Sequence, residues 1–155
     1  MNISFNEIKI LTEEIIGKGN SKYIFGIYWK EFYTAIIDCE KNLTERTFRK
    51  SLKECNFKDP NRIGTLSFLC PFLCLRILGR VHKGIFGLFY TGFLLWWYPF
   101  YIFTLINSVI DREVSFVLLA GTICLILISL NFMMWCREYN RLELLDTLVK
   151  NRRET

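Results

Sequence analysis

The sequence predicts an all-α integral membrane protein whose two transmembrane helices form one hairpin at residues 84–136. Two long stretches, 84–110 and 114–136, contain 27 and 23 residues and no charged side chain. A helix needs about 20 apolar residues to cross a hydrocarbon core of roughly 30 Å. Only Asp111, Arg112 and Glu113 separate the two stretches, so the chain must turn and return to the side it came from.

A soluble fold is the alternative, and the size of the chain argues against it. A chain of 155 residues is too short to surround two helices that are apolar on every face. The first 20 residues carry several charged side chains and no uninterrupted apolar region. We therefore expect no cleavable signal peptide before the hairpin.

The charges that flank the hairpin predict its orientation. Lys and Arg close to the ends of a span resist translocation, and eight of them lie at the outer ends of the hairpin against one in its loop. Both termini are therefore expected on the cytoplasmic side, in a bacterial inner membrane. The net charge of +5 is explained by this asymmetry and by attraction to anionic lipid headgroups. We expect no binding of nucleic acid.

Residues 1–62 are expected to form a cytoplasmic region of amphipathic helices. Residues 4–7 have the form of a capping box, and glycine at position 17 ends the helix that follows. A second helix is expected at 21–40. A third is expected to begin at another box, residues 42–45, and to end at 59–61, where a proline stands.

The second of these helices carries Tyr28, Trp29 and Phe32 on one side. Two interpretations remain open for this aromatic face. The helices could pack against one another as a small bundle, because short helices bury little surface alone. Alternatively, the aromatic face could contact a partner protein or the lipid headgroups.

Residues 63–83 are predicted to be an interfacial or re-entrant basic segment. The uncharged run 63–75 is too short to span a membrane, and Pro71 would bend it. Arg76, Arg80 and Lys83 follow and could reach phosphate groups. The alternative is a helix buried against the N-terminal bundle.

The first span carries its aromatic residues in an unusual place. Trp96, Trp97 and Tyr98 lie near its middle, just before Pro99, whereas such residues usually collect at the two interfaces. Either the helix breaks at Pro99, or these side chains contact the second span, where serine and asparagine offer oxygens. The residues expected in close helix packing are Gly84, Gly87, Gly92 and Asn131.

The tail, residues 137–155, is expected to continue as an amphipathic basic helix that lies on the membrane or returns to the N-terminal bundle. Arg137 would contact lipid headgroups. The predicted apolar stripe of the tail consists of Tyr139, Leu142, Leu145 and Leu148 or Val149.

No pattern predicts a catalytic site, a metal site or a cofactor. Cys70, Cys74 and His82 could supply three zinc ligands, but their spacing is irregular and a fourth ligand is missing. His82 lies between two cations, which would favour its neutral form. Neither span contains a carboxylate that could relay protons.

One segment resembles a known group of proteins. Residues 68–72, Phe-Leu-Cys-Pro-Phe, are followed by Arg76 and by Lys83-Gly84 at the start of an aromatic span. This order resembles small uncharacterised bacterial two-span inner-membrane proteins, in which a Phe-rich segment with proline precedes a basic turn and a helical hairpin. Cys70 stands where that group usually has glycine. The resemblance covers about residues 65–141 and implies architecture and a bacterial or phage setting, with no activity.

These features favour a non-enzymatic small membrane protein that works by protein–protein contact. It could be a subunit of a membrane complex, or an immunity-type or exclusion-type inhibitor of another membrane-active protein. Its expected partners are the lipid bilayer and another membrane protein or a second copy of itself. The alternatives are an oligomeric pore or transporter component and, with less support, a lipid-modifying enzyme that uses His82.

Overall fold

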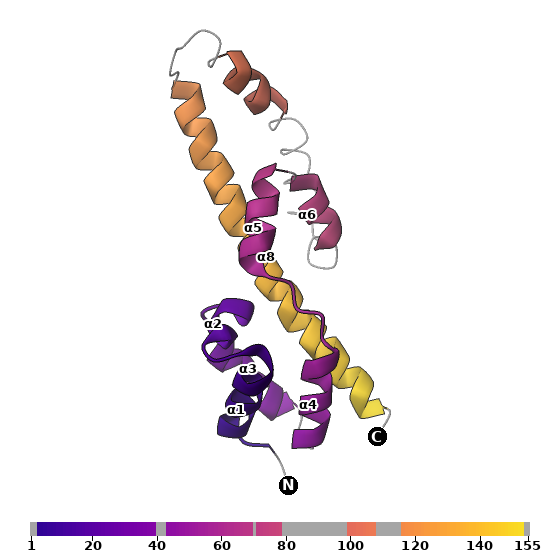
Figure 1. The fold of residues 1–155 in the computed structure, drawn as a ribbon. Coiled ribbons are helices and arrows are strands. Elements are labelled where there is room, and N and C mark those ends of the chain that lie inside the picture. Colours follow the sequence, from indigo (N-terminus) through magenta and orange to yellow (C-terminus); the bar gives the residue numbers. More distant parts are fainter. Residues whose placement is uncertain (1–2, 40–42, 70, 79–98, 108–115, 154–155) are drawn as a thin grey trace. The chain divides into compact units, whose positions relative to one another are not determined.

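The computed structural model describes residues 3–39, 43–69, 71–78, 99–107 and 116–153. Within these ranges every regular element is an α-helix, as the sequence predicts (Figure 1). The helices are α1 (Phe5–Ile16), α2 (Asn20–Phe25), α3 (Trp29–Cys39), α4 (Glu45–Glu54), α5 (Pro60–Leu69), α6 (Pro71–Ile77) and α8 (Phe116–Arg153), and residues 99–107 are also helical.

The chain divides into two compact units, and α8 contributes to both. Unit 1 comprises residues 1–60 and 136–155, and unit 2 comprises residues 61–135. Helices α1 to α4 therefore pack with the C-terminal part of α8. Helices α5 and α6 belong with its N-terminal part.

Helix α1 begins and ends where the sequence predicts. The Ser4 side chain accepts a hydrogen bond from the Glu7 amide, and the Glu7 carboxylate accepts one from the Ser4 amide at 2.6 Å. These hydrogen bonds lower the pKa of Glu7. The helix ends at Gly17, whose φ of 102° is easily reached only by glycine.

The prediction of a single helix at 21–40 is wrong, because the helix is interrupted at Gly26. Gly26 has a φ of 86°, and its amide donates to the Lys22 carbonyl at 2.9 Å, which closes α2. Residues 27 and 28 then form a turn before α3 begins at Trp29. The break lets α2 and α3 present different faces to one core.

Two boundaries around α4 also differ from the prediction. Thr44 is the N-cap, and its hydroxyl accepts a hydrogen bond from the Thr47 amide at 3.3 Å. The helix ends at Glu54, well before the proline that was expected to stop it. Pro60 is instead the first residue of α5, a position at which its fixed φ favours a helix and its missing N–H is not needed.

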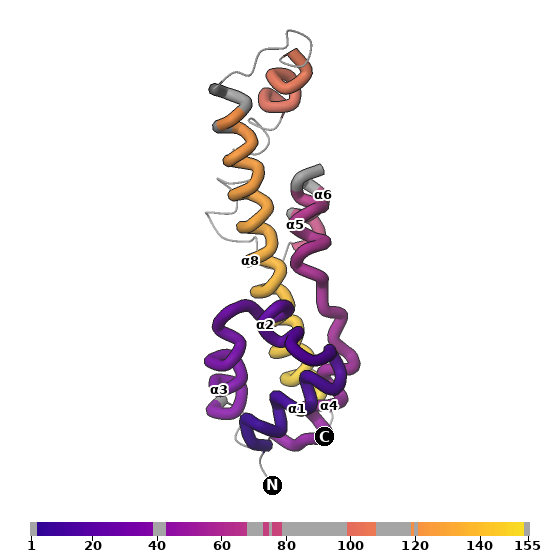
Figure 2. Tube along the Cα trace, turned by 60° about the vertical axis from the view of Figure 1, so that its left-hand side comes forward, coloured from indigo at the N-terminus to yellow at the C-terminus, as the bar shows by residue number. Residues whose placement is uncertain are grey.

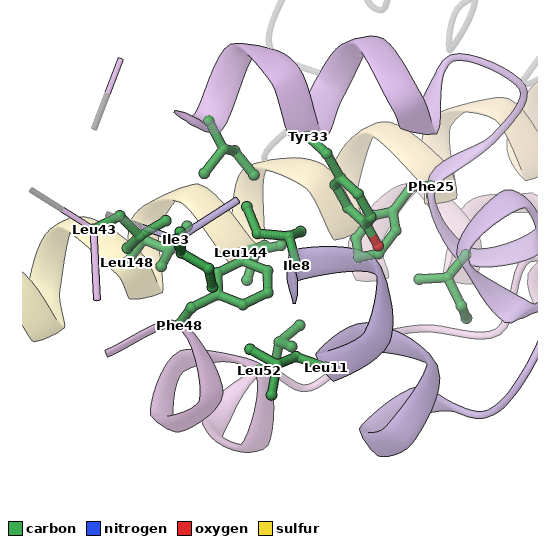
Figure 3. Packing of buried hydrophobic residues seen from close by; sticks show 12 residues of the cluster. Ile3, Ile8, Leu11, Phe25, Tyr33, Leu43, Phe48, Leu52, Leu144 and Leu148 are labelled. Atoms are coloured by element: carbon green, nitrogen blue, oxygen red, sulfur yellow. The ribbon is translucent and has the colours of Figure 1, made fainter. Parts of the chain in front are cut away.

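The core of unit 1 joins α1, α2, α3 and α4 to the C-terminal part of α8 (Figure 3). Tyr33 and Phe25 are both fully buried in this core, with ring centroids 5.9 Å apart. The Tyr33 hydroxyl donates to Ser21 Oγ at 3.2 Å, and burial raises its pKa. Fully burying one large apolar side chain contributes about 1.5–3 kcal/mol. Leu144 and Leu148 of α8 belong to this core, so the tail packs on the N-terminal helices.

The tail is helical as predicted, but the stripe predicted for it is only partly right: Leu148 is buried and Tyr139 half-buried. Leu142, Leu145 and Val149 are 37–43% exposed. The buried face of this segment consists of Cys136, Asn140, Leu144, Leu148 and Asn151. This face is buried because its two asparagine side chains donate hydrogen bonds to groups on α2 and α4, and leucine side chains could not make these hydrogen bonds.

In unit 2 the apolar run 63–75 forms two helices separated at Pro71. Helix α6 folds back beside α5, and the Cys74 thiol donates to the Ile63 carbonyl at 3.5 Å. The Ser129 hydroxyl of α8 donates to the Gly64 carbonyl of α5 at 2.8 Å. Helices α5 and α8 run side by side in opposite directions (Figure 2). Within unit 2, α5 thus contacts both α6 and α8.

Candidate functional site

The first candidate is an apolar surface on the part of α8 that lies in unit 2. Buried and exposed residues alternate with helical period, and the buried side includes Leu125, Ile128 and Phe132. On the opposite side every exposed large residue among the described side chains is apolar. These residues, called the exposed α8 face below, are Leu119, Ile123, Ile126, Leu127, Leu130 and Met134, each 48–62% exposed.

Residues 99–107 add to the apolar surface of unit 2. Phe100, Phe103 and Ile106 are 54–65% exposed. The Tyr101 side chain is buried, and its hydroxyl lies 3.2 Å from Thr122 Oγ1 of α8. This polar contact links the residues after Pro99 to the N-terminal part of α8.

Helices α5 and α8 approach closely at Gly64. A Cβ at this position would lie 2.7 Å from Met133 Cγ and 3.2 Å from Ser129 Oγ, so only glycine fits without displacement. The Gly64 carbonyl accepts hydrogen bonds from the hydroxyls of Ser129 and Ser67, at 2.8 and 2.7 Å. Small residues with hydroxyls at a contact are typical of helix pairs in membranes.

The α5–α6 hairpin has a cation near each end. Arg62 lies in the first turn of α5 and Arg76 in the last turn of α6, and both are exposed. The residues between them carry no charge. An apolar hairpin with one arginine near each end has the charge pattern of a segment whose two cations contact the same layer of lipid headgroups.

The second candidate is a polar junction in unit 1, at which α8 caps the C-terminal end of α2. The carbonyls of the last turn of a helix lack intrahelical partners. Here Arg137 Nε donates to the Tyr23 carbonyl at 3.2 Å, and Arg141 Nε donates to the Phe25 carbonyl at 2.8 Å. Both cations also lie favourably at the negative end of the helix dipole.

Asn140 completes this junction. Its Nδ2 donates to the carbonyls of Ile24 and Lys58, at 3.1 and 2.9 Å, and its Oδ1 accepts from the Lys58 amide at 2.8 Å. Gly26 packs directly against the same side chains, because a Cβ there would lie 3.2 Å from Arg137 Cδ. The α2–α8 junction therefore consists of Arg137, Asn140 and Arg141 on the carbonyls of Tyr23, Ile24, Phe25 and Lys58.

The structure separates the three aromatic residues that were predicted to share one face. Trp29 packs on Phe5 and Tyr33, with ring centroids 6.3 and 5.5 Å apart. Phe32 packs on Phe25 and lies under the Arg141 guanidinium. Tyr28 alone points outward, with 61% of its surface exposed.

Several predicted contact residues lie outside the described ranges. They are Arg80, Lys83, Gly84, Gly87, Gly92, Trp96, Trp97 and Tyr98. Of the rest, Arg76 is exposed, Asn131 is half-buried, and Arg137 belongs to the α2–α8 junction. Among the zinc candidates, Cys74 bonds the Ile63 carbonyl, while Cys70 and His82 are not described. No cluster of three metal-ligating side chains occurs within the described residues.

The sequence analysis did not predict the helix contact at Gly64 or the buried hydrogen bonds of Asn140, although a pattern in the sequence surrounds each residue. Gly64 and Ser67 are small residues three apart within the apolar run 63–75. Asn140 continues the buried series Ile128, Phe132 and Cys136 by one more helical step. The spacing of four residues is visible in the sequence, but only the structure shows that this series is the buried one.

Comparison with known proteins adds no family to these observations. The chain matches no protein-family model, no curated protein and no solved structure. By length and composition, one helical stretch in the described residues, Gly121–Arg153, could cross a membrane.

Proposed function

We propose that this chain is a non-enzymatic integral membrane protein that works by contact with another membrane protein. The observation that carries the proposal is the exposed α8 face. Its six residues are large, apolar and 48–62% exposed, and the run 114–136 that contains them has no charge. Such a surface suits lipid chains and partner helices, and in water it would favour aggregation.

The low burial of α8 supports a membrane span over a soluble core helix. A core helix is buried over most of its surface, whereas 28% of the most apolar window of α8 is buried. With residues 84–110 as the first span, the hairpin places both termini in the cytoplasm of a bacterium. Unit 1 then lies on the cytoplasmic side, where the eight Lys and Arg residues that flank the two spans also lie.

A function by contact is supported by the two sides of α8 in unit 2, one of which packs against α5 while the other is exposed. One side holds α5 through Gly64 and Ser129. The other side leaves six apolar residues for a neighbour. A subunit of a membrane complex and an inhibitor of another membrane-active protein both require such a surface.

Extraction in a mild detergent tests the contact function. The full chain, tagged and expressed at natural level, should elute with a stoichiometric membrane partner or as a defined homo-oligomer. Leu127→Trp on the exposed α8 face should reduce this association at least about tenfold, since a bulky side chain prevents close helix packing. Leu142→Trp, an exposed leucine of the tail, is the matched control and should leave it unchanged. A strictly monomeric chain would contradict the proposal, and ion flux in liposomes would indicate a pore instead.

A further inference from the structure

The turn between α2 and α3 presents two large apolar side chains without cover from unit 1. Ile27 is 65% exposed and Tyr28 is 61% exposed. The residues on either side of them turn inward, since Phe25 is fully buried and Trp29 packs on Tyr33. Within this segment, the two residues of the turn are thus exposed, whereas the residues on either side of them pack into unit 1.

The turn between α2 and α3 lies next to the start of the charged part of α8. Gly26, directly before the turn, packs on Arg137, and Arg137 also binds the Tyr23 carbonyl. Arg137 is the first charged residue after the uncharged run 114–136. The Cα atom of Tyr28 lies at most about 8 Å from that of Gly26, because consecutive Cα atoms are 3.8 Å apart.

Helix α4 contacts α8 farther from that run. Asn151 Nδ2 donates to Ser51 Oγ and to Glu54 Oε2 of α4, both at 2.9 Å. Within unit 1, α2 thus lies at the end of the α8 segment that adjoins the uncharged run, and α4 lies toward the C-terminus (Figure 1). The turn after α2 is therefore at the level where the predicted span ends.

Charge around the turn favours an anionic surface. Lys22 and Lys30 flank it in sequence, and Lys30 Nζ lies 5.7 Å from the centre of the Trp29 ring. Arg137 and Arg141 lie against Gly26, the residue directly before the turn. The acids nearby include Glu31, Asp59 and Glu138. The Asp59 carboxylate accepts a hydrogen bond from the Tyr23 hydroxyl, and the Glu138 carboxylate is bound to Arg141 at 2.7 Å. Apolar and aromatic tips surrounded by cations are typical of segments that enter the headgroup layer.

We propose that Ile27 and Tyr28 insert into the boundary between headgroups and acyl chains of the same bilayer that α8 crosses. This inference rests on the proposed membrane span and names lipid as the occupant of the turn. Insertion anchors α2 and α3 at the cytoplasmic surface. Within unit 1, the α2–α8 junction then fixes α2 to the part of α8 that follows the uncharged run, through three consecutive carbonyls of α2.

Depth-dependent quenching tests the inference on the full chain. An environment-sensitive fluorescent amino acid is placed at position 27, 10 or 127, and each protein is reconstituted in vesicles of phosphatidylethanolamine and phosphatidylglycerol. Ile10 is the matched control, because it is an isoleucine of unit 1 with 63% exposure, on α1. Leu127, on the exposed α8 face, reports on the span itself. Vesicles carry a nitroxide either near the top of the acyl chains or near their ends.

The expected result separates the three positions. The nitroxide near the top of the chains should quench the probe at 27 at least about twofold more than the probe at 10, because interfacial side chains reach only the outermost 5–10 Å. The probe at 127 should be quenched best by the nitroxide near the chain ends. Equal, weak quenching at 27 and 10 with strong quenching at 127 would overturn the insertion of the turn alone. Absence of quenching at 127 would overturn the span and the inference with it.

Discussion

At the scale of single residues, Asn140 has the most demanding position in unit 1. Its side chain is fully buried and holds both backbone groups of Lys58 and the carbonyl of Ile24. The Lys58 amide lies between α4 and α5, outside any helix, and Asn140 Oδ1 is the acceptor it has in this structure. A buried backbone group that loses its partner costs about 1–3 kcal/mol.

Asn140→Ala should therefore destabilise unit 1 by about 2–4 kcal/mol, because several buried groups lose their partner together. Amide hydrogen exchange of the full chain in a mild detergent gives a local readout. The Lys58 amide should exchange at least about tenfold faster in the variant. Asn6→Ala, at an exposed asparagine of α1, is the control and should change neither quantity. Unchanged protection of Lys58 would show that Asn140 is not its effective acceptor.

Cys55 provides a pH dependence in unit 1. Its thiol donates to the Glu143 carbonyl at 3.8 Å, and burial, with the nearby carboxylates of Glu143 and Glu54, raises its pKa from 9.0 to about 11. A raised pKa means that folding favours the protonated thiol. Its contribution to stability is complete below pH 9 and is lost as the pH rises through about 11.

Alkylation measured by mass spectrometry checks this shift. At pH 9 Cys55 should react with iodoacetamide about 50-fold more slowly in the folded chain than in the unfolded chain, because far less thiolate is present. The rate should keep rising as the pH approaches 11. A rate that is half-maximal near pH 9 would mean that the pKa is not raised.

At the scale of helices, the contact between α5 and α8 depends on the absence of a side chain at Gly64. Gly64→Ala gains helix propensity of about 1 kcal/mol, but its Cβ would lie 2.7 Å from Met133 Cγ. In the wild-type background we expect the clash to prevail and the chain to be destabilised. In a Met133→Ala background the two nearest atoms, Met133 Cγ and Sδ, are gone and Ser129 Oγ at 3.2 Å is the one tight contact left of those three, so the same substitution should be neutral or stabilising.

The sign change between the two backgrounds is the measured quantity. Thermal unfolding of the four chains in one detergent gives a coupling energy, expected at about 1–2 kcal/mol. Thr65→Ala, at the exposed neighbour on α5, should show no coupling to Met133→Ala. Additive effects of Gly64→Ala and Met133→Ala would contradict the close approach of α5 and α8.

Helix boundaries were predictable where the signal is local. The capping box at residues 4–7, the glycine at 17 and the proline at 71 act through their own backbone, and the structure has each boundary there. Gly26 was missed because a single glycine inside an aromatic segment is tolerated in many helices. What makes it a break is the packing of residues 137 and 141 against it, which lies more than 100 residues away in sequence.

The buried face of the tail shows the same limit. A prediction from hydrophobic period places leucines inward, as it did for Leu142 and Leu145. The structure instead turns Asn140 and Asn151 inward, because carbonyl, hydroxyl and carboxylate groups on other helices accept their amide hydrogens. The positions of those groups follow from the fold as a whole, so the period of the tail alone could not reveal them.

At the scale of the whole molecule, α8 is one helix with two kinds of exposed surface. In unit 2 the large exposed residues that the structure describes on α8 are all apolar. In unit 1 the exposed residues include Glu138, Asp146 and Lys150 beside Leu142 and Leu145. A helix whose surface changes in this way at residue 137 suits two media, hydrocarbon for the first part and water or headgroups for the second.

Paired acidic substitutions test this division in the living cell. Ile123→Asp with Leu127→Asp places two carboxylates on the exposed α8 face, at a cost of about 6–8 kcal/mol if that face lies in hydrocarbon. The second span should then fail to insert, so the C-terminus stays outside. Green fluorescent protein fused after residue 155 should lose fluorescence, and alkaline phosphatase fused there should gain activity.

The control pair is Leu142→Asp with Leu145→Asp, two exposed leucines on the same helix beyond Arg137. These residues meet no hydrocarbon in the proposed arrangement, so both reporters should behave as in the wild type. If α8 were exposed to water along its whole length, all four positions would tolerate aspartate equally, because each is already exposed. Equal behaviour of the two pairs would therefore reject the span, whereas a reversal confined to residues 123 and 127 would place the membrane boundary between them and residue 142.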